Sequence, residues 1–247
     1  MRIVCISDTH NYHNQMEHPI PKGDVLIHAG DISGVGEMYE VTKFVNWFKN
    51  IEGFEYKIFI AGNHDLSFER INQPHRRGNY DWLSNLISDP YLPHSSVYYL
   101  EDSSLVIETT EFSKPIKFYG TPWQPEFFNW AFNLPRDGEE LYQKWQMIPD
   151  DTNVLITHGP PYNVRDYVPD GDSVGCRLLR DRIEVIKPQL NVFGHIHHAH
   201  GMSLVGDTMY VNASICTERY KPTNKPIVVD LKEIDGQILA YPVDESN

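Results

Sequence analysis

Short apolar runs that end at polar residues or glycine recur along this chain of 247 residues. Three of them, residues 2–7, 24–29 and 56–61, lie near its start and are typical of buried strands in a parallel sheet. Residues 37–50 lie between the second and third runs and place apolar side chains at helical spacing, which predicts an amphipathic helix. The first part of the chain therefore predicts strands that alternate with helices.

The remaining chain continues with short strand-like runs and one further helix-like segment. We expect strands at residues 97–100, 105–110, 116–120, 154–157, 190–194, 202–205 and 208–212, a helix at residues 137–146, and a terminal pair of strands at residues 226–231 and 237–241. No internal repeat, low-complexity tract or Ser/Gly linker divides the sequence. We therefore expect residues 1–247 to form a single domain.

Composition favours a packed core in a reducing compartment. Hydrophobic residues make up 40% of the chain and aromatic residues 12%, which argues against global disorder. The three cysteines, Cys5, Cys176 and Cys216, lie far apart and form no C-x-x-C pair, so we expect neither a disulfide framework nor a cysteine zinc site. The N-terminus enters a strand pattern without a signal peptide, and no run of about 18 apolar residues is present. We expect a cytoplasmic protein without a membrane span.

The net charge of −13 restricts the partners that the chain can bind. A surface this acidic repels a phosphate backbone, which argues against tight non-specific binding of long nucleic acid. Two bound divalent cations would offset about four of these charges, and would do so at the site itself.

Five short segments carry side chains that commonly bind metal ions. They are Asp8-Thr9-His10, Gly30-Asp31, Gly62-Asn63-His64-Asp65, Thr157-His158-Gly159 and Gly194-His195-Ile196-His197. Their key polar residues follow predicted strands, and ligand sites of α/β sheets collect at the carboxyl ends of strands, so we expect the segments to converge. Carboxylate oxygens and imidazole nitrogens suit divalent ions such as Mn²⁺, Fe²⁺ and Zn²⁺.

Spacing within two of these segments suggests shared metal ligation. On an extended segment, residues i and i+2 lie on one face, so Asp8 and His10 could reach one ion. His195 and His197 could do the same, although either pair alone is weak evidence. Glycine precedes three of the candidate ligands, where it allows a sharp turn and a close approach of the backbone.

In this order, the five segments resemble the motifs of the calcineurin-like metallophosphoesterase superfamily, which are D-x-H, G-D, G-N-H-[DE], a later H and G-H-x-H. They span residues 8–197, most of the chain. The sequences at residues 24–31, 61–65, 120–123 and 156–161 also resemble the small branch named for its metallophosphoesterase domain, whose studied members are cyclic-nucleotide phosphodiesterases. The resemblance implies an α/β fold, a four-layer α-β-β-α sandwich of two mixed sheets with flanking helices.

The resemblance also implies a centre of two divalent metal ions, with Mn²⁺ as the first choice and Fe or Zn as alternatives. Asp8, His10 and His197 would bind the first ion, Asn63, His158 and His195 the second, and Asp31 would bridge them. A hydroxide between the metals would be the nucleophile, because two metals about 3.5–4 Å apart lower the pKa of a shared water and clamp an in-line displacement at phosphorus. As a neutral ligand, Asn63 would keep the charge of the site low enough for an anionic substrate.

His64 directly follows the candidate ligand Asn63. An imidazole there could donate a proton to the leaving oxygen, which makes His64 the candidate general acid, with a hydrogen-bonding role around the ligands as the alternative. Asp65 could orient His64, as carboxylates often do for histidines, or it could simply be solvated. Asn11 is a candidate contact to a phosphate oxygen, and His200 is a candidate pocket residue.

Other residues near these motifs have a plainer interpretation. His13 fits a surface histidine, and His198 would point away from its two neighbouring histidines if the segment were a strand. Arg165 lies in a polar segment, residues 162–171, that resembles a cap loop, and a surface salt bridge fits it better than a phosphate contact. The aromatic side chains of residues 123–130 could stack on a nucleobase, but packing of a long loop against the sheet is the favoured interpretation.

These observations predict a metal-dependent phosphoesterase, and within that class a phosphodiesterase of small nucleotides or cyclic nucleotides. The alternatives are a phosphomonoesterase or protein phosphatase, a nuclease, and a non-catalytic scaffold of the same fold. The complete ligand set and His64 favour an enzyme over a scaffold, and the net charge of −13 disfavours a nuclease. We expect a small phosphate ester as the partner, with a nucleotide favoured. The natural substrate, the native metal and homo-oligomerisation stay open.

Overall fold

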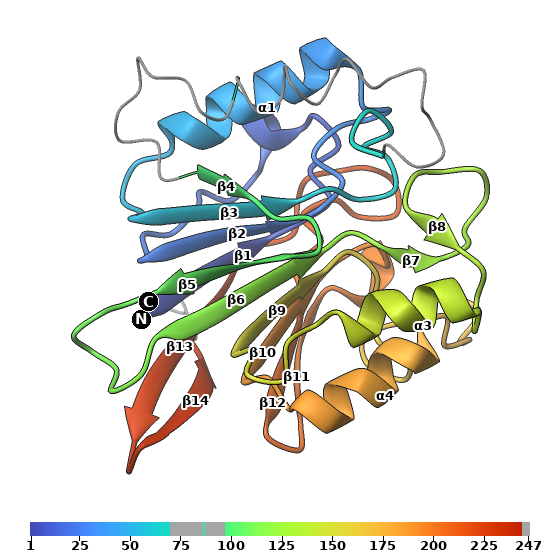
Figure 1. The fold of residues 1–247 in the computed structure, drawn as a ribbon. Coiled ribbons are helices and arrows are strands. Elements are labelled where there is room, and N and C mark those ends of the chain that lie inside the picture. Colours follow the sequence, from blue (N-terminus) through green and yellow to red (C-terminus); the bar gives the residue numbers. More distant parts are fainter. Residues whose placement is uncertain (70–85, 87–96, 244–247) are drawn as a thin grey trace.

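Two six-stranded sheets organise the residues that the computed structural model describes, which are residues 1–69, 86 and 97–243 (Figure 1). The first sheet contains β1 (Arg2–Ile6), β2 (Val25–Ala29), β3 (Tyr56–Ile60), β4 (Val97–Tyr99), β13 (Ile227–Ile234) and β14 (Gln237–Pro242). The second contains β5 (Ser103–Ile107), β6 (Ile116–Thr121), β9 (Val154–Thr157), β10 (Leu190–Phe193), β11 (Gly201–Val205) and β12 (Thr208–Asn212). A short parallel pair, β7 (Gln124–Pro125) and β8 (Asn133–Leu134), stands beside them.

Both sheets are mixed. The first has the order β14-β13-β1-β2-β3-β4, in which β1 to β4 are parallel to one another, β13 is antiparallel to β1, and β14 is antiparallel to β13. The second has the order β11-β12-β10-β9-β6-β5, with four parallel strands in the middle and antiparallel β11 and β5 at the edges. The buried parallel strands therefore carry their polar carboxyl ends to one rim of each sheet.

Helices cover the outer faces of the two sheets. The helix α1 (Met38–Asn50) lies over the first sheet, and α3 (Glu139–Gln146) and α4 (Arg177–Ile186) lie over the second (Figure 1). Alternate residues of the strands divide between two apolar layers. In β1, Val4 packs on the helix side together with Phe44 of α1, whereas Ile3 belongs to the layer between the sheets. The predicted four-layer α-β-β-α sandwich is confirmed.

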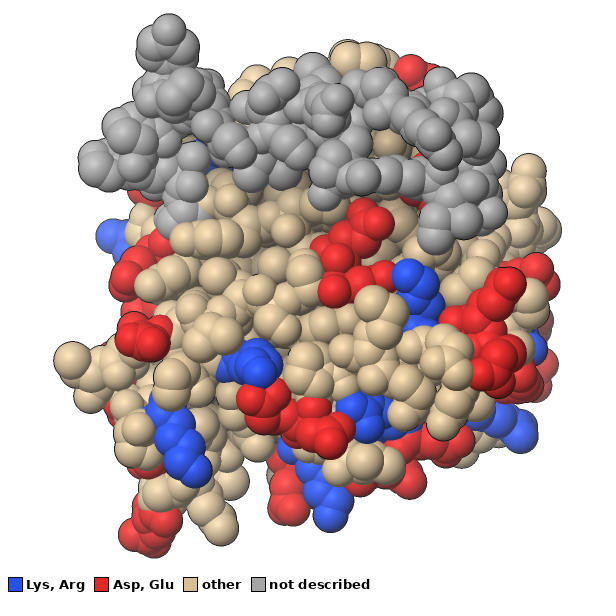
Figure 2. Space-filling model, viewed as in Figure 1, with Lys and Arg blue, Asp and Glu red and all other residues tan. Residues whose placement is uncertain are grey.

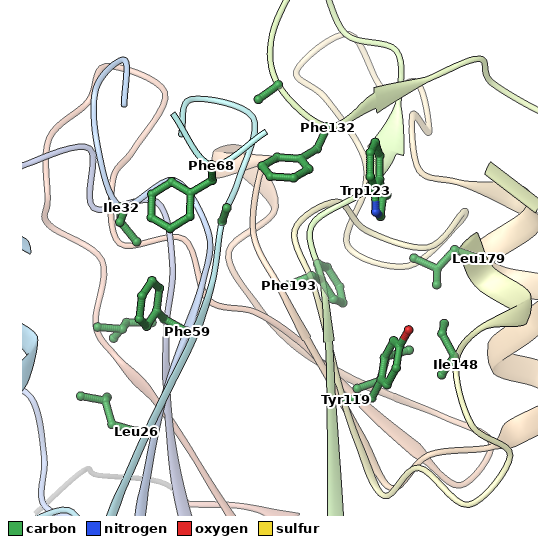
Figure 3. Packing of buried hydrophobic residues seen from close by; sticks show 14 of the residues in the cluster. Leu26, Ile32, Phe59, Phe68, Tyr119, Trp123, Phe132, Ile148, Leu179 and Phe193 are labelled. Atoms are coloured by element: carbon green, nitrogen blue, oxygen red, sulfur yellow. The ribbon is translucent and has the colours of Figure 1, made fainter. Parts of the chain in front are cut away.

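The two helix-facing layers are rich in aromatic rings. Figure 3 shows Phe59 on the side of the first sheet, and Tyr119 and Phe193 on the side of the second, near Leu179 of α4. Burial of each such large side chain contributes roughly 1.5–3 kcal/mol, so the sheets and helices form a firm base for the loops at their rim. No helix among the described residues is both long enough and apolar enough to cross a bilayer.

The helix α4 was not predicted from the sequence. It begins at Cys176, whose Sγ accepts a hydrogen bond from the Leu179 amide, so the usual Ser, Thr, Asp or Asn signal at a helix start is missing. Its buried side chains, Leu179, Ile183 and Ile186, do follow helical spacing. The strand predicted at residues 105–110 instead runs from Ser103 to Ile107.

The carboxyl ends of the parallel strands meet across the two sheets. Ser7, just beyond β1, forms an isolated parallel bridge with Ser214, just beyond β12. The Gly194 amide, after β10, donates to the His158 carbonyl after β9. Segments that lie far apart in the sequence are therefore held together at one rim of the sandwich.

Candidate metal centre

The five polar segments converge at this rim, as the strand pattern predicts. Asp8, His10 and His197 form one group, in which the Nε2 atoms of His10 and His197 lie 3.3 Å apart. Asn63 and His158 form the core of a second group, with His158 Nε2 2.9 Å from Asn63 Oδ1. The His195 ring stands next to His158, with ring centroids 5.1 Å apart.

Asp31 lies between the two groups. Its Oδ2 is 3.7 Å from His10 Nε2 in the first group and 3.4 Å from His158 Nε2 in the second. Its Oδ1 accepts a hydrogen bond of 2.8 Å from the His64 amide, which fixes the direction of the carboxylate. One carboxylate thus faces nitrogen donors from both sides.

Backbone carbonyls fix the orientation of two imidazoles. His158 Nδ1 lies 2.9 Å from the Ala29 carbonyl, and His197 Nδ1 lies 3.0 Å from the Thr217 carbonyl. An Nδ1–H that donates to a carbonyl leaves Nε2 to face the centre, which is the arrangement that metal-binding histidines usually show. His10 differs, because its buried Nδ1 has no hydrogen-bond partner within the described part of the chain.

Asp8 is fully buried and held by its surroundings. Its Oδ2 accepts a hydrogen bond of 2.9 Å from the Ser214 hydroxyl, and both of its oxygens lie 3.1 Å from the His195 amide. Its Oδ1 lies 3.3 Å from His197 Nε2. The bridge between the two sheets therefore also positions a candidate ligand.

The backbone at these residues is not extended, so one argument made from the sequence was wrong. Asp8, His10, Asp31 and His195 have φ values of 52°, 40°, 54° and 66°. Such left-handed conformations cost of order 1–3 kcal/mol each and persist only where the surroundings enforce them. Asp8 and His10 meet because the chain turns, with their amides bonded to the Gly30 and Asp31 carbonyls, and not because they share one face of a strand.

The H-x-H segment departs from the strand interpretation in the same way. His197 begins the 3-10 turn η3 (His197–Ala199), which sends His198 to the surface. There His198 Nδ1 pairs with Glu218 Oε1 at 2.6 Å. Among the described residues, His198 belongs to none of the metal-binding groups, but it lines the pocket together with Glu218.

Two glycines make the close approach possible. A Cβ at Gly194 would lie 1.9 Å from Asp8 Oδ2, and a Cβ at Gly62 would lie 2.3 Å from Asp31 Oδ1. Both distances are far too short for any side chain. Glycine before His195 and before Asn63 is thus required by the carboxylates that lie against it.

Electrostatics keep both carboxylates ionised. Burial alone would raise the pKa of Asp8, but the hydrogen bond and charge of His197 hold it well below its usual range. Burial likewise opposes ionisation of Asp31, and His158 outweighs it and lowers the pKa of that carboxyl. Burial would lower the pKa of His158, but the charge of Asp31 outweighs it and raises this pKa to about 9. Buried anions of this kind need cations beside them, either protonated imidazoles or metal ions.

The donor set suits divalent metal ions. Three of its residues, Asp8, His10 and His197, place one ligand atom each within 4.8 Å of the others, and Asp8, Asp31 and His158 do the same. The two Nε2 atoms that face each other at 3.3 Å, with the buried carboxylates of Asp8 and Asp31 beside them, fit a cation between them. Oxygen and imidazole ligands without any thiolate favour Mn²⁺, Fe²⁺ or Zn²⁺ over softer metals.

His64 lies at the edge of this centre. Its ring stacks on Trp130 with centroids 4.1 Å apart and an interplanar angle of 22°, and its Nδ1 lies 2.6 Å from the Gly34 carbonyl. It also meets the His10 ring edge-on at 4.6 Å. The ring of His64 is thus held from three sides while it lines the pocket over the centre.

Asp65 has neither of the two roles considered from the sequence, because its carboxylate is fully buried and bonds the backbone and Ser33 instead of the His64 ring. Its buried carboxylate accepts hydrogen bonds from the Gly62, Ile32 and Ser33 amides and from the Ser33 hydroxyl, at 2.5–3.2 Å. It therefore ties the loop after β3 to the loop after β2. These are the loops that carry Asn63 and Asp31.

Asn11 and His200 are both engaged elsewhere. Asn11 Nδ2 donates to Glu40 Oε1 at 2.5 Å, and His200 Nε2 lies 3.0 Å from the Lys225 carbonyl. Neither residue lines the pocket at the centre. Arg165 makes no salt bridge within the described residues. It donates instead to the Ser203 hydroxyl and to the backbone carbonyls of His200 and Met202. His13 is buried against Trp47, not exposed as the sequence suggested.

A pocket of about 370 Å³ opens over the metal centre. Its floor includes Asp31, Asn63, His195 and His197, and its wall includes Phe127 and other apolar side chains. The aromatic segment divides its roles. Phe127 lines the pocket and Trp130 supports His64, whereas Trp123 is buried and Phe128 is 82% exposed. The cap loop also reaches the pocket, through Val168 and Pro169.

The polar pocket residues that sequence reasoning missed include Gln124, Arg136, Glu218 and Tyr220. Tyr220 has φ of 54° and places its ring 4.9 Å from His10 and 5.6 Å from His197. Gln124 begins β7, Arg136 follows β8, and Glu218 and Tyr220 follow β12, and none of them belongs to a local motif. Only the fold brings them to the centre.

Comparisons with known proteins agree with this geometry. A family model described as calcineurin-like phosphoesterase matches residues 1–199. Metallophosphoesterase domain-containing protein 1 of Homo sapiens is 41% identical over 250 residues, which cover 93% of this chain and 71% of the relative. UPF0046 protein K07C11.7 of Caenorhabditis elegans is 36% identical over 229 residues, which cover 92% of this chain and 74% of the relative.

Solved structures share the fold at low sequence identity. NAD nucleotidase of Haemophilus influenzae has a TM-score of 0.52 at 12% identity, over 99% of this chain and 49% of that chain. GAP50, the anchor in the inner membrane complex of Plasmodium, has a TM-score of 0.52 at 11% identity, over 99% of this chain and 88% of that chain. One is named as a nucleotidase and the other as an anchor, so fold alone does not decide the activity. By its sequence, however, this chain belongs to the calcineurin-like phosphoesterase family.

Proposed function

We propose that this protein is a metal-dependent phosphodiesterase that hydrolyses small nucleotide or cyclic-nucleotide esters. Membership of the family supports a metal-dependent phosphoesterase. The observation that carries the proposal is the position of Asp31, whose Oδ2 lies 3.7 Å from His10 Nε2 and 3.4 Å from His158 Nε2. A carboxylate placed between two groups of donors fits a ligand shared by two neighbouring metal ions.

The residues divide naturally between two metal ions. Asp8, His10 and His197 would bind the first, Asn63, His158 and His195 the second, and Asp31 both. Manganese is the proposed metal, with iron or zinc as alternatives, since all the ligands are oxygen or imidazole nitrogen. When bound, the two ions would neutralise phosphate charge and supply an activated water.

His64 is the proposed general acid. Its Nδ1 faces the Gly34 carbonyl, so the other ring nitrogen is left to exchange a proton with a substrate in the pocket. The Trp130 stack holds the ring plane, which restricts where that proton can be delivered. General acids of this kind typically contribute about 10²–10⁴-fold to the rate, most of all when the leaving group is a poor one such as an alkoxide.

The surroundings favour a small substrate. The pocket of about 370 Å³ suits a ligand of nucleotide size better than a polymer. On the face that Figure 2 shows, Lys and Arg are interspersed with Asp and Glu, and no continuous basic stripe is visible among the coloured residues. With a net charge of −13, this supports a small ester over long nucleic acid. Cys5, Cys176 and Cys216 are free and buried, which fits the proposed cytoplasmic location.

Hydrolysis of bis(p-nitrophenyl) phosphate tests the proposal. Protein stripped of metal and then loaded with Mn²⁺ should release p-nitrophenolate, and EDTA should abolish the release. A parallel assay with p-nitrophenyl phosphate separates the diesterase from a monoesterase. Absence of turnover on both esters with Mn²⁺, Fe²⁺ and Zn²⁺ would contradict the proposal and favour a non-catalytic role.

A further inference from the structure

Gln124 carries a buried, unpartnered acceptor beside the pocket. Its side chain is only 1% exposed, yet it lines the pocket over the metal centre. Its Nε2 donates to Asn133 Oδ1 at 3.3 Å, whereas its Oε1 has no hydrogen-bond partner within the described part of the chain. A buried acceptor without a partner is destabilising, so its presence in a ligand pocket points to a donor that arrives with the ligand.

The hydrogen bonds of Asn133 determine which atom of the Gln124 amide is left without a partner. The Nδ2 of Asn133 donates to the Phe127 and Phe128 carbonyls at 3.1 and 2.9 Å, so its amide cannot be flipped without losing both bonds. The Oδ1 of Asn133 must then face Gln124, and only the Nε2 of Gln124 can meet it as a donor. The free atom of Gln124 is therefore an acceptor by necessity.

This acceptor lies close to the metal centre. A Cβ placed on Gly159 would be 3.6 Å from the Cβ of Gln124 and 3.9 Å from its Oε1, and Gly159 directly follows His158. Phe127, three residues after Gln124, meets the His195 ring edge-on at 5.2 Å. The acceptor thus lies next to the residue that follows His158, on the side of the pocket that Phe127 also lines.

We propose that Gln124 determines substrate specificity by accepting a hydrogen bond from a donor on the organic part of the substrate. The donor cannot belong to an ionised phosphate diester, whose oxygens only accept hydrogen bonds and would be repelled by Oε1. A sugar hydroxyl or an amino group of a nucleobase supplies the required O–H or N–H, while Phe127 and the neighbouring apolar wall cover the rest of the molecule. The inference rests on the proposed function and adds which kind of substrate group the pocket recognises.

Competitive inhibition separates this inference from the proposed function. With Mn²⁺-loaded protein and bis(p-nitrophenyl) phosphate as substrate, inhibition constants are measured for AMP, for 2′-deoxy-AMP, for 3′-deoxy-AMP, and for the 5′-monophosphate of purine riboside, which lacks the amino group. The two deoxy analogues test the sugar hydroxyls, and the purine riboside analogue tests the base. For the donor that Gln124 binds, we expect AMP to inhibit roughly 5- to 150-fold more strongly than the analogue that lacks it.

The variant Gln124→Met keeps the side-chain volume and removes the acceptor. In this variant the ratio of inhibition constants between AMP and the analogue that lacks the donor bound by Gln124 should fall toward one. The ratios between AMP and the other analogues should be retained. Gln124→Glu, which keeps an acceptor oxygen, should retain more of the preference. Gln143→Met, on the exposed face of α3 and away from the pocket lining, is the matched control and should behave like the unaltered protein.

Several results would overturn the inference while leaving the proposed function intact. Hydrolysis of bis(p-nitrophenyl) phosphate together with equal inhibition by all four nucleotides would show that Oε1 accepts no hydrogen bond from the sugar or the base. Ratios of inhibition constants that are unchanged in a folded Gln124→Met protein would also overturn the inference. If Gln124→Met does not fold, the ratios of Gln124→Glu and the unaltered protein decide, because a missing preference in the unaltered protein already refutes the inference.

Discussion

The imidazoles of His10 and His197 face each other with their Nε2 atoms 3.3 Å apart. The two residues lie almost at opposite ends of the matched family region, and Tyr220 packs edge-on against both rings. This short distance is favourable when the lone pairs of both nitrogens point at one cation. Without a cation, the two nitrogens have to share one proton in a hydrogen bond. The pair therefore marks the position of the first proposed metal ion.

Protons and metal ions should compete for this centre. Asp31 outweighs burial and raises the pKa of His158 to about 9, so at neutral pH the metal-free protein holds a proton that metal binding must displace. Affinity for Mn²⁺ should rise with pH up to about 9 and fall as pH decreases, by about tenfold per pH unit for each displaced proton. Calorimetric titration in buffers of different ionisation enthalpy counts the protons released. Binding that is independent of pH would contradict the assignment of His158.

Asp31→Ala should damage activity most. The change removes the one side chain that faces both donor groups, so a loss of roughly 10³-fold or more in kcat is expected. His197→Ala should weaken mainly one metal and lose roughly 10- to 100-fold. Asp181→Ala, on the exposed surface of α4, is the control for removing one carboxylate. Equal and mild losses in the first two variants would argue against a shared ligand.

His64→Ala should show its effect through the leaving group. A ribose alkoxide needs a proton to leave, whereas p-nitrophenolate hardly does, so the loss should approach about 10²–10⁴-fold on a nucleotide diester and be much smaller on a p-nitrophenyl ester. The kcat for both esters is measured at saturating metal, and metal content is measured alongside. Similar fractional losses on both esters, or rescue by excess Mn²⁺, would mean that His64 only shapes the site.

Asp65→Ala should lower stability as well as activity. The change leaves three buried backbone amides and the Ser33 hydroxyl without their shared acceptor. Unpaired buried donors cost about 1–3 kcal/mol each, so we expect a loss of about 3–5 kcal/mol in the free energy of unfolding. Denaturant unfolding measures this value, and Asp65→Asn, which keeps the shape and one acceptor oxygen, should lose less. Unchanged stability in the Ala variant would leave the carboxylate without the structural role described above.

The strands and the rim where they end could be predicted from periodicity, whereas the four-layer sandwich was predicted from the strand-rich pattern together with the resemblance to a known family. Apolar runs that stop just before Asp8, Asp31 and His158 indicate buried strands that end at one edge. The order of the motifs carries the resemblance from which the ligand set was predicted. That residues 1–247 form one domain stays a prediction.

Conformation and partners of the site residues could not be predicted in the same way. The left-handed backbone at Asp8 and His10 depends on hydrogen bonds to the loop after β2, which no local pattern reveals. Asp65 was linked to its sequence neighbour His64, whereas its carboxylate binds amides around thirty residues away and at Gly62. Gln124 and Tyr220 reach the pocket only through long-range packing.

Counting bound metal ions tests the central claim most directly. The protein is stripped of metal, dialysed against Mn²⁺ and analysed for manganese per chain, and the Asp31→Ala variant is treated in parallel. Two donor groups that share Asp31 predict close to two ions per chain in the unaltered protein and clearly fewer in the variant. A ratio that stays at zero or one with Mn²⁺ in excess would contradict a dinuclear centre.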